Sequence, residues 1–148
     1  MTLEITDELM RKIHAHGEAA YPNEGAGLLL GQGYAGSDKD SSCKQVIAIL
    51  TLDNSREDAA RHNRYLLTAR DYQRGEIEAA RLGLDVLGVF HSHPDHPNRP
   101  SEFDREWAMP WFSYIITSVQ AGKVAGSCSW LLKEDRLAFE QEEMVISA

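Results

Sequence analysis

The sequence predicts a single α/β (α+β) domain in which helices pack against a mixed, mostly antiparallel β-sheet. Its length of 148 residues suits one domain with its own core, and we treat residues 1–148 as that domain. Short apolar runs such as 45–52 and 113–119 indicate buried strands. Two longer segments, 7–20 and 68–83, carry apolar residues at helical spacing.

The first half of the chain predicts one helix and two strands. A helix over 7–20 begins at Thr6 or Asp7 and ends before Pro22. A buried strand is expected over 24–31, and a hairpin loop over 33–42 leads into a strand over 45–52. The apolar side of the helix is expected to contain Leu9, Met10, Ile13 and Ala20.

The middle of the chain predicts a polar loop over 53–64 and a short strand over 64–67. Thr68 and Asp71 have the spacing of a capping box, with Asp in place of the usual Glu. The helix that they open is expected to end at Gly83. Its inward-facing residues are expected to be Ile77, Ala80 and Leu84.

The last part of the chain predicts a strand over 86–90 that leads into a pair of histidines. A short helix then begins near Asp104, runs to Met109 and is stopped by Pro110. Three closing strands are expected over 113–119, 127–132 and 136–140.

Composition excludes several classes of function. The net charge of −8 and the scattered lysines and arginines argue against a nucleic-acid partner. No apolar run approaches the ~18 residues needed to span a membrane, and the first residues lack the order of a signal peptide. Cys43 and Cys128 are far apart and belong to no Cys-x-x-Cys pair, so we interpret them as small buried hydrophobes. We therefore expect a cytoplasmic protein.

One segment carries most of the chemical information. His91 and His93 stand two residues apart at the end of an apolar run, so a strand would project both imidazoles from one face. Pro94 stops the strand, and a proline-rich loop leads to Ser101 and Asp104 at a helix start. Two imidazoles and one carboxylate form a zinc site that leaves the fourth position open, as a catalytic metal needs. The spacing predicts a hydrolase.

Other interpretations of the same residues stay open at this point. Ser101 and Asp104 also have the spacing of a capping box, which is compatible with metal binding by Asp104. His91, His93, Asp95 and His96 fit His-x-His-x-Asp-His, the signature of metallo-β-lactamase-like hydrolases with two metals. Those enzymes need further histidines downstream, and no histidine follows His96. We favour a surface position for His96.

The segment from His91 to Asp104 resembles the JAMM motif of the MPN-domain metalloproteases: His-Ser-His-Pro, six residues, Ser, two residues and Asp. Glu24 matches the upstream glutamate of that motif, and the resemblance covers nearly the whole chain. It implies a cytidine-deaminase-like fold and one zinc ion per chain, bound by His91, His93 and Asp104. By the same resemblance, Glu24 accepts a proton from the attacking water, and Ser101 helps to hold the developing oxyanion. The residues alone do not distinguish Glu24 from Glu18 or Glu57.

The resemblance also suggests a substrate. Compact prokaryotic relatives act on ubiquitin-like sulfur carriers, cutting after the C-terminal Gly-Gly, whereas eukaryotic relatives are deubiquitinating isopeptidases. We therefore expect a zinc peptidase or isopeptidase with a ubiquitin-like protein as partner substrate. A non-catalytic MPN scaffold or binding module is the alternative. The sequence does not reveal the oligomeric state.

Overall fold

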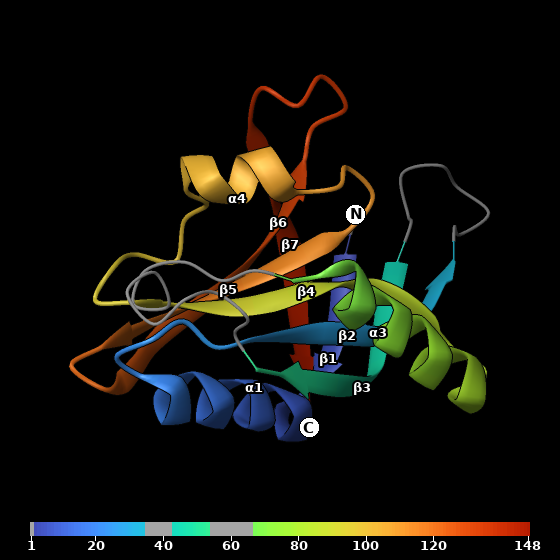
Figure 1. Cartoon of the computed structure of the whole chain (residues 1–148), viewed down its shortest axis with the longest axis horizontal. Coiled ribbons are helices and arrows are strands. Elements are labelled where there is room, and N and C mark those ends of the chain that lie inside the picture. Colours follow the sequence, from blue (N-terminus) through green and yellow to red (C-terminus); the bar gives the residue numbers. More distant parts are fainter. Residues whose placement is uncertain (1, 35–42, 54–66) are drawn as a thin grey trace.

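In the computed structural model, which describes residues 2–34, 43–53 and 67–148, the strands form one sheet that closes into a barrel. Figure 1 shows the helices on the outside of this barrel, with α1 below the strands, α3 at one side and α4 above them. The strands are β1 (Thr2–Thr6), β2 (Ala26–Tyr34), β3 (Cys43–Leu52), β4 (Asp85–Pro94), β5 (Ser113–Gln120), β6 (Lys123–Leu132) and β7 (Phe139–Ser147), and the helices are α1 (Asp7–Ala20), α3 (Ala69–Leu82) and α4 (Glu102–Trp107).

The strand order around the barrel is β1-β3-β2-β4-β5-β6-β7. Neighbours pair antiparallel in β2/β3, β2/β4, β5/β6 and β6/β7, and in parallel in β4/β5, β1/β3 and β1/β7. The expectation of a mixed, mostly antiparallel sheet with helices against it is confirmed. Strand β4 lies between β2 and β5, so the histidine pair is placed in the middle of the sheet.

The strand β1 was not predicted, and it closes the barrel by pairing with both β3 and β7. Its burial alternates, with Leu3 and Ile5 almost fully buried between more exposed neighbours. This period of two is a strand signal that the sequence contains. It is short, however, and the partners that make it a strand lie more than 35 residues away in the chain.

Helix α1 has the predicted bounds, and Thr6 caps it by accepting a hydrogen bond from the Leu9 N–H. Helix α3 also begins with the predicted capping box of Thr68 and Asp71 and ends at Gly83. The prediction that Ile77 and Ala80 point inward was wrong, because both are exposed.

The buried side of α3 is formed by small residues. Gly75 and Ala79, one helical turn apart, face the sheet. A side chain at Gly75 would collide with Leu28, so the glycine lets the helix approach β2 closely. This close approach turns Ile77 toward solvent.

Several boundaries also differ from the prediction. Strand β2 begins at Ala26 rather than at residue 24, β7 begins at Phe139 rather than 136, and α4 starts at Glu102 and ends at Trp107 rather than at Met109. Of the hairpin loop expected over 33–42, Gly33 and Tyr34 belong to β2 and the rest lies outside the described residues. Most of the expected polar loop over 53–64 and of the expected short strand over 64–67 also lies outside them. Cys43 and Cys128 are unbridged and only half-buried, so full burial was wrong.

The core consists of two apolar clusters on opposite faces of β2 and β4. Leu28 and Val89 face the cluster that packs under α3, whereas Leu29 and Phe90 face the cluster that includes α1 and β1. A strand that packs against apolar residues on both faces has a continuous apolar sequence. This explains the unbroken apolar runs of β2 and of the part of β4 before the histidines.

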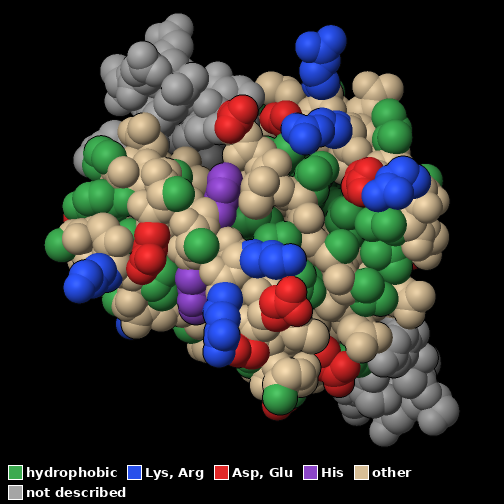
Figure 2. All heavy atoms as spheres, turned by 90° about the horizontal axis from the view of Figure 1, so that it is seen from below, with side chains coloured by type: hydrophobic (Ala, Val, Ile, Leu, Met, Phe, Trp, Pro, Cys, Tyr) green, Lys and Arg blue, Asp and Glu red, His purple; other side chains and the backbone are tan. Residues whose placement is uncertain are grey.

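No helix in the described ranges is long and apolar enough to cross a membrane. On the face seen in Figure 2, which includes the outer side of α1, basic side chains are interspersed with acidic ones and do not form a continuous patch.

Candidate metal centre

Strand β4 delivers both predicted histidines to one place. His91 pairs with Ala26 of β2 and Ile116 of β5, and His93 pairs with Ser118 of β5. Residues two apart in a strand point to the same face, and the centroids of the two imidazole rings are 5.0 Å apart. His91 is 1% exposed and His93 8%. The nitrogens of two buried imidazoles need hydrogen-bond partners or a metal ion, because burial without a partner is costly.

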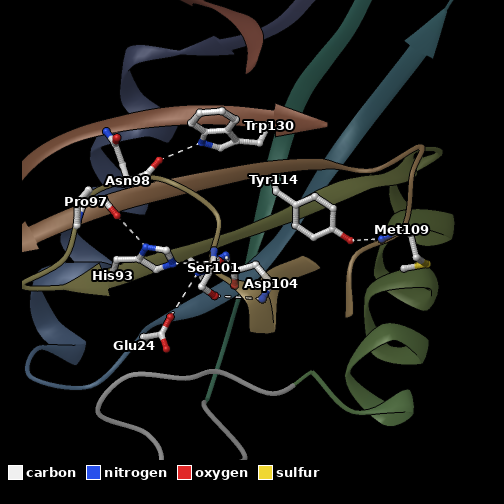
Figure 3. A network of polar contacts seen from close by, with 10 residues as sticks. Glu24, His93, Pro97, Asn98, Ser101, Asp104, Met109, Tyr114 and Trp130 are labelled. Carbon is white, nitrogen blue, oxygen red and sulfur yellow. Dashed lines mark hydrogen bonds and ion pairs between the residues drawn. The ribbon is translucent and has the colours of Figure 1, made fainter. Parts of the chain in front are cut away.

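The start of α4 brings the carboxylate of Asp104 to this pair. Ser101 Oγ accepts a hydrogen bond from the Asp104 N–H at 3.1 Å, and Asp104 Oδ2 accepts one from the Ser101 N–H at 2.7 Å. The capping box is therefore formed, as its spacing predicts. It holds the Asp104 side chain at the helix N-terminus, directed back toward β4, so capping and a place at the metal site are compatible (Figure 3).

The distances in this group suit a tetrahedral metal ion. Asp104 Oδ1 lies 3.4 Å from His91 Nε2, and Asp104 Oδ2 lies 3.2 Å from His93 Nε2. Ligand atoms ~2.0–2.1 Å from zinc in a tetrahedron are separated from one another by about 3.3 Å. Each of the two nitrogen–oxygen separations, one from each oxygen of the carboxylate, is close to that edge length. Nitrogen and oxygen donors of this kind are among those that zinc prefers, so these three residues fit the ion.

The carbonyl oxygen of Pro97 lies 2.9 Å from His93 Nδ1. A carbonyl can only accept a hydrogen bond, so Nδ1 carries the hydrogen and donates it. This contact leaves Nε2, the nitrogen that faces Asp104, as the metal-binding atom. Metal-binding histidines usually have their second nitrogen held in this way.

The electrostatics of the metal-free site follow from this arrangement. Burial alone would lower the pKa of His93, but Asp104, the Pro97 carbonyl and Glu24 outweigh it and raise that pKa. Burial alone would likewise raise the pKa of the Asp104 carboxyl. The neighbouring His91 and His93 and the Ser101 N–H prevail, and they lower it to about 2. The same contacts that lower the pKa of Asp104 therefore favour the protonated form of His93.

Glu24 lies at the same site, just before β2, and is 3% exposed. Its Oε1 atom is 3.5 Å from His91 Nδ1. Glu24, His91 and His93 each offer a donor atom, and these atoms lie within 4.8 Å of one another. Figure 3 shows the Glu24 carboxylate directed toward His93 and Ser101. The structure thus brings together all five residues that the motif comparison selected.

The two carboxylates approach different nitrogens of His91. Asp104 faces Nε2, whereas Glu24 faces Nδ1. Of these two carboxylates, Asp104 has its oxygens facing the Nε2 atoms of both histidines, so we predict Asp104 as the third ligand and Glu24 as a neighbour of the ion. These roles stay predictions.

The rival two-metal arrangement is not assembled. The Asp95 carboxylate accepts hydrogen bonds from the Tyr21 hydroxyl at 2.7 Å and from the Ala121 N–H at 2.8 Å, so it connects the end of α1 with the turn between β5 and β6. His96 is exposed, as expected, although it also lines the cleft described next.

A cleft of about 420 Å³ opens beside the site. A larger apolar groove of about 1120 Å³ runs along α3 and α4, and Phe103 lines both hollows. The cleft wall includes Glu24, His93, His96, Arg99, Ser101 and Phe103.

Three contributions to the site were missed in the sequence. The buried Ser92 bonds to Gly25, the Pro97 carbonyl orients His93, and Arg99 lines the cleft. Ser92 stands between the two histidines, so its position could have drawn attention. The Pro97 contact depends on the path of the loop, which local sequence does not specify.

Known proteins resemble this chain in sequence and in fold. Residues 6–133 match the family described as prokaryotic homologs of the JAB domain. No curated protein sequence matches the chain. A solution structure from Salinibacter ruber is 42% identical, with a TM-score of 0.72 over 97% of this chain and 90% of that one. A solution structure from Desulfitobacterium hafniense is 30% identical, with a TM-score of 0.80 over 98% and 92%.

More distant structures share the fold. A JAB1/MPN domain protein from Archaeoglobus fulgidus is 18% identical, with a TM-score of 0.58 over 99% of this chain and 97% of that one. A structure described as JAMM, a metalloprotease-like zinc site in the proteasome and signalosome, is also 18% identical, with a TM-score of 0.56 over the full length of both chains. The predicted fold class is thereby confirmed.

Proposed function

The chain belongs to the family of prokaryotic homologs of the JAB domain, and we propose that it is a zinc-dependent peptidase. The proposed reaction is hydrolysis of the bond after the C-terminal Gly-Gly of a ubiquitin-like protein of the sulfur-carrier type. The observation that carries the proposal is the Asp104 carboxylate, which faces the Nε2 atoms of both His91 and His93 beside an open cleft.

Different residues around the cleft would bind the metal, transfer the proton and stabilise the oxyanion. His91, His93 and Asp104 would hold the ion, which when bound supplies a Lewis acid and lowers the pKa of a coordinated water to about 7. Glu24 takes the proton of the attacking water and passes it to the leaving amine. Ser101 Oγ accepts from the Asp104 N–H, so its own hydrogen can be donated to the oxyanion.

The size of the cleft supports a tail without bulky side chains. Its volume of about 420 Å³ lies toward the small end of ligand sites, and Pro94, Pro97 and Pro100 contribute to its walls. An extended Gly-Gly segment presents only backbone to such walls. A folded ubiquitin-like body would stay outside, while its C-terminal tail enters.

The test is incubation of the zinc-loaded protein with sulfur-carrier and ubiquitin fusions that extend beyond Gly-Gly. Mass spectrometry of the products should show a new C-terminus at the second glycine. The same protein after treatment with a chelator should give no product, and activity should return with zinc. Absence of cleavage from every fusion, with one zinc bound per chain, would contradict the proposal and favour a binding module.

A further inference from the structure

The loop between β4 and α4 is tied to the barrel through its carbonyl groups. The carbonyl of His96 accepts from Ser118 Oγ at 2.6 Å, and that of Asn98 accepts from Trp130 Nε1 at 3.0 Å. Together with the bond from His93 to Pro97, three consecutive carbonyls are fixed, and Figure 3 shows those of Pro97 and Asn98. The next residue is Arg99, so its backbone is held at the edge of the cleft.

Among the described residues, Arg99 is a cation at the cleft with no acidic partner. It is exposed, it lines the cleft together with Glu24 and Ser101, and it forms no ion pair with any of the described residues. The acidic neighbour Glu102 is instead bonded to Arg105 at 2.7 Å. The chain has 23 acidic and 15 basic residues, so an excess of positive charge does not explain why Arg99 has no acidic partner among the described residues.

Guanidinium is suited to this position. Its planar, permanently charged group binds a carboxylate through two parallel hydrogen bonds. Prolines on both sides, at 97 and 100, restrict the backbone, so less freedom is lost when a ligand is bound. Asp104 already lies against the two histidines, so the free charge at the cleft rim remains available to a substrate.

We infer that Arg99 determines specificity by binding a carboxylate on the segment released after Gly-Gly. This inference rests on the proposed peptidase function and adds a substrate class to it. The carboxylate is either the C-terminal α-carboxylate of a single released residue or an acidic side chain at that position. Arg99 takes no part in proton transfer.

The test compares three tails fused to the same carrier: Gly-Gly-Ala with a free carboxylate, Gly-Gly-Ala amide and Gly-Gly-Asp amide. The zinc-loaded protein should cleave at least one charged tail with a kcat/KM about five- to tenfold above that of the neutral amide. Preference for the first tail alone identifies the α-carboxylate, and preference for the third identifies an acidic side chain. Arg99→Ala should remove the preference mainly through KM, and Arg99→Lys should keep part of it.

Arg81→Ala is the matched control, because it removes the same charge from the surface of α3, where Arg81 pairs with Glu78. It should keep the preference. Binding of the three tails to zinc-loaded Glu24→Gln protein, measured by calorimetry, gives a readout that needs no turnover. Equal affinity for charged and neutral tails, unchanged by Arg99→Ala, would overturn the inference even if cleavage is observed. Selective binding without cleavage by the unmutated protein would support the inference and contradict the peptidase proposal.

Discussion

Ser92 and Gly25 are joined by two hydrogen bonds. The Ser92 N–H donates to the Gly25 carbonyl at 2.9 Å, and Ser92 Oγ accepts from the Gly25 N–H at 2.9 Å. Ser92 stands between the two histidines, and Gly25 follows Glu24 directly. One buried serine therefore fixes the proposed general base relative to the proposed metal ligands.

Replacing Ser92 with alanine should lower kcat about tenfold while zinc content stays the same. The change leaves the buried Gly25 N–H without a partner, which costs roughly 1–3 kcal/mol and loosens the position of Glu24. Turnover and metal analysis of the purified variant test this. Ser127→Ala is the control, because Ser127 bonds to His14 and Thr117 away from the cleft. Unchanged turnover in Ser92→Ala would show that the bond has no role in catalysis.

Glu24→Gln should retain zinc and lower kcat by at least about 100-fold, because the amide keeps the shape but cannot accept the proton. Glu18→Gln is a matched control at an exposed site, where the side chain accepts a bond from the Val124 N–H. It should have wild-type activity. A Glu24→Gln protein with wild-type turnover would remove Glu24 from the mechanism.

Asp104→Ala should weaken zinc binding by more than about 100-fold. Mutation of residues that only orient metal ligands already lowers metal affinity about 10- to 100-fold, and loss of a ligand should cost more. The substitution also breaks half of the α4 capping box. Asp71→Ala separates the two effects, because it breaks the equivalent capping box on a different helix, α3. A competitive zinc titration should show weaker zinc binding in Asp104→Ala and unchanged zinc binding in Asp71→Ala. Equal affinities in the two variants would exclude Asp104 as a ligand.

In the zinc-free protein, Asp104 and His93 together should stabilise the folded state most in mild acid. The pKa of Asp104 is lowered from 3.8 to about 2, so its contribution is present above pH 3.8 and is lost toward pH 2. The pKa of His93 is raised from 6.5, so its contribution is present below pH 6.5 and is lost as the pH rises through the folded-state value.

Urea unfolding across this range, in the unmutated protein and in Asp104→Asn, isolates the contribution of this carboxylate. The two proteins should differ in free energy of unfolding by on the order of 2 kcal/mol near pH 5, and this difference should shrink toward pH 2. A difference that is independent of pH would contradict the ionic contact between Asp104 and the histidines.

Local patterns in the sequence were sufficient for part of the fold. The cap at Thr6 and the spacing of Met10 and Ile13 predicted α1, and both capping boxes were correctly located. The pair His91 and His93 was readable because a strand places residues two apart on one face. These features depend on residues within one turn or one strand.

Contacts between distant segments could not be predicted in the same way. The barrel closes because β1 pairs with β7, and no local signal specifies that pairing. Glu24 meets His91 across 67 positions of sequence, so only the family resemblance selected it. Ile77 was placed inward by its hydrophobicity, whereas the close approach of Gly75 to Leu28 determines which side of α3 is buried.

The position of zinc in crystals of the metal-loaded protein is the most direct test of the proposed metal centre. Anomalous diffraction at the zinc absorption edge should give one peak per chain, about 2.1 Å from the Nε2 atoms of His91 and His93 and from an oxygen of Asp104. A fully occupied zinc elsewhere, or a second ion at His96, would contradict a single zinc centre at these three residues.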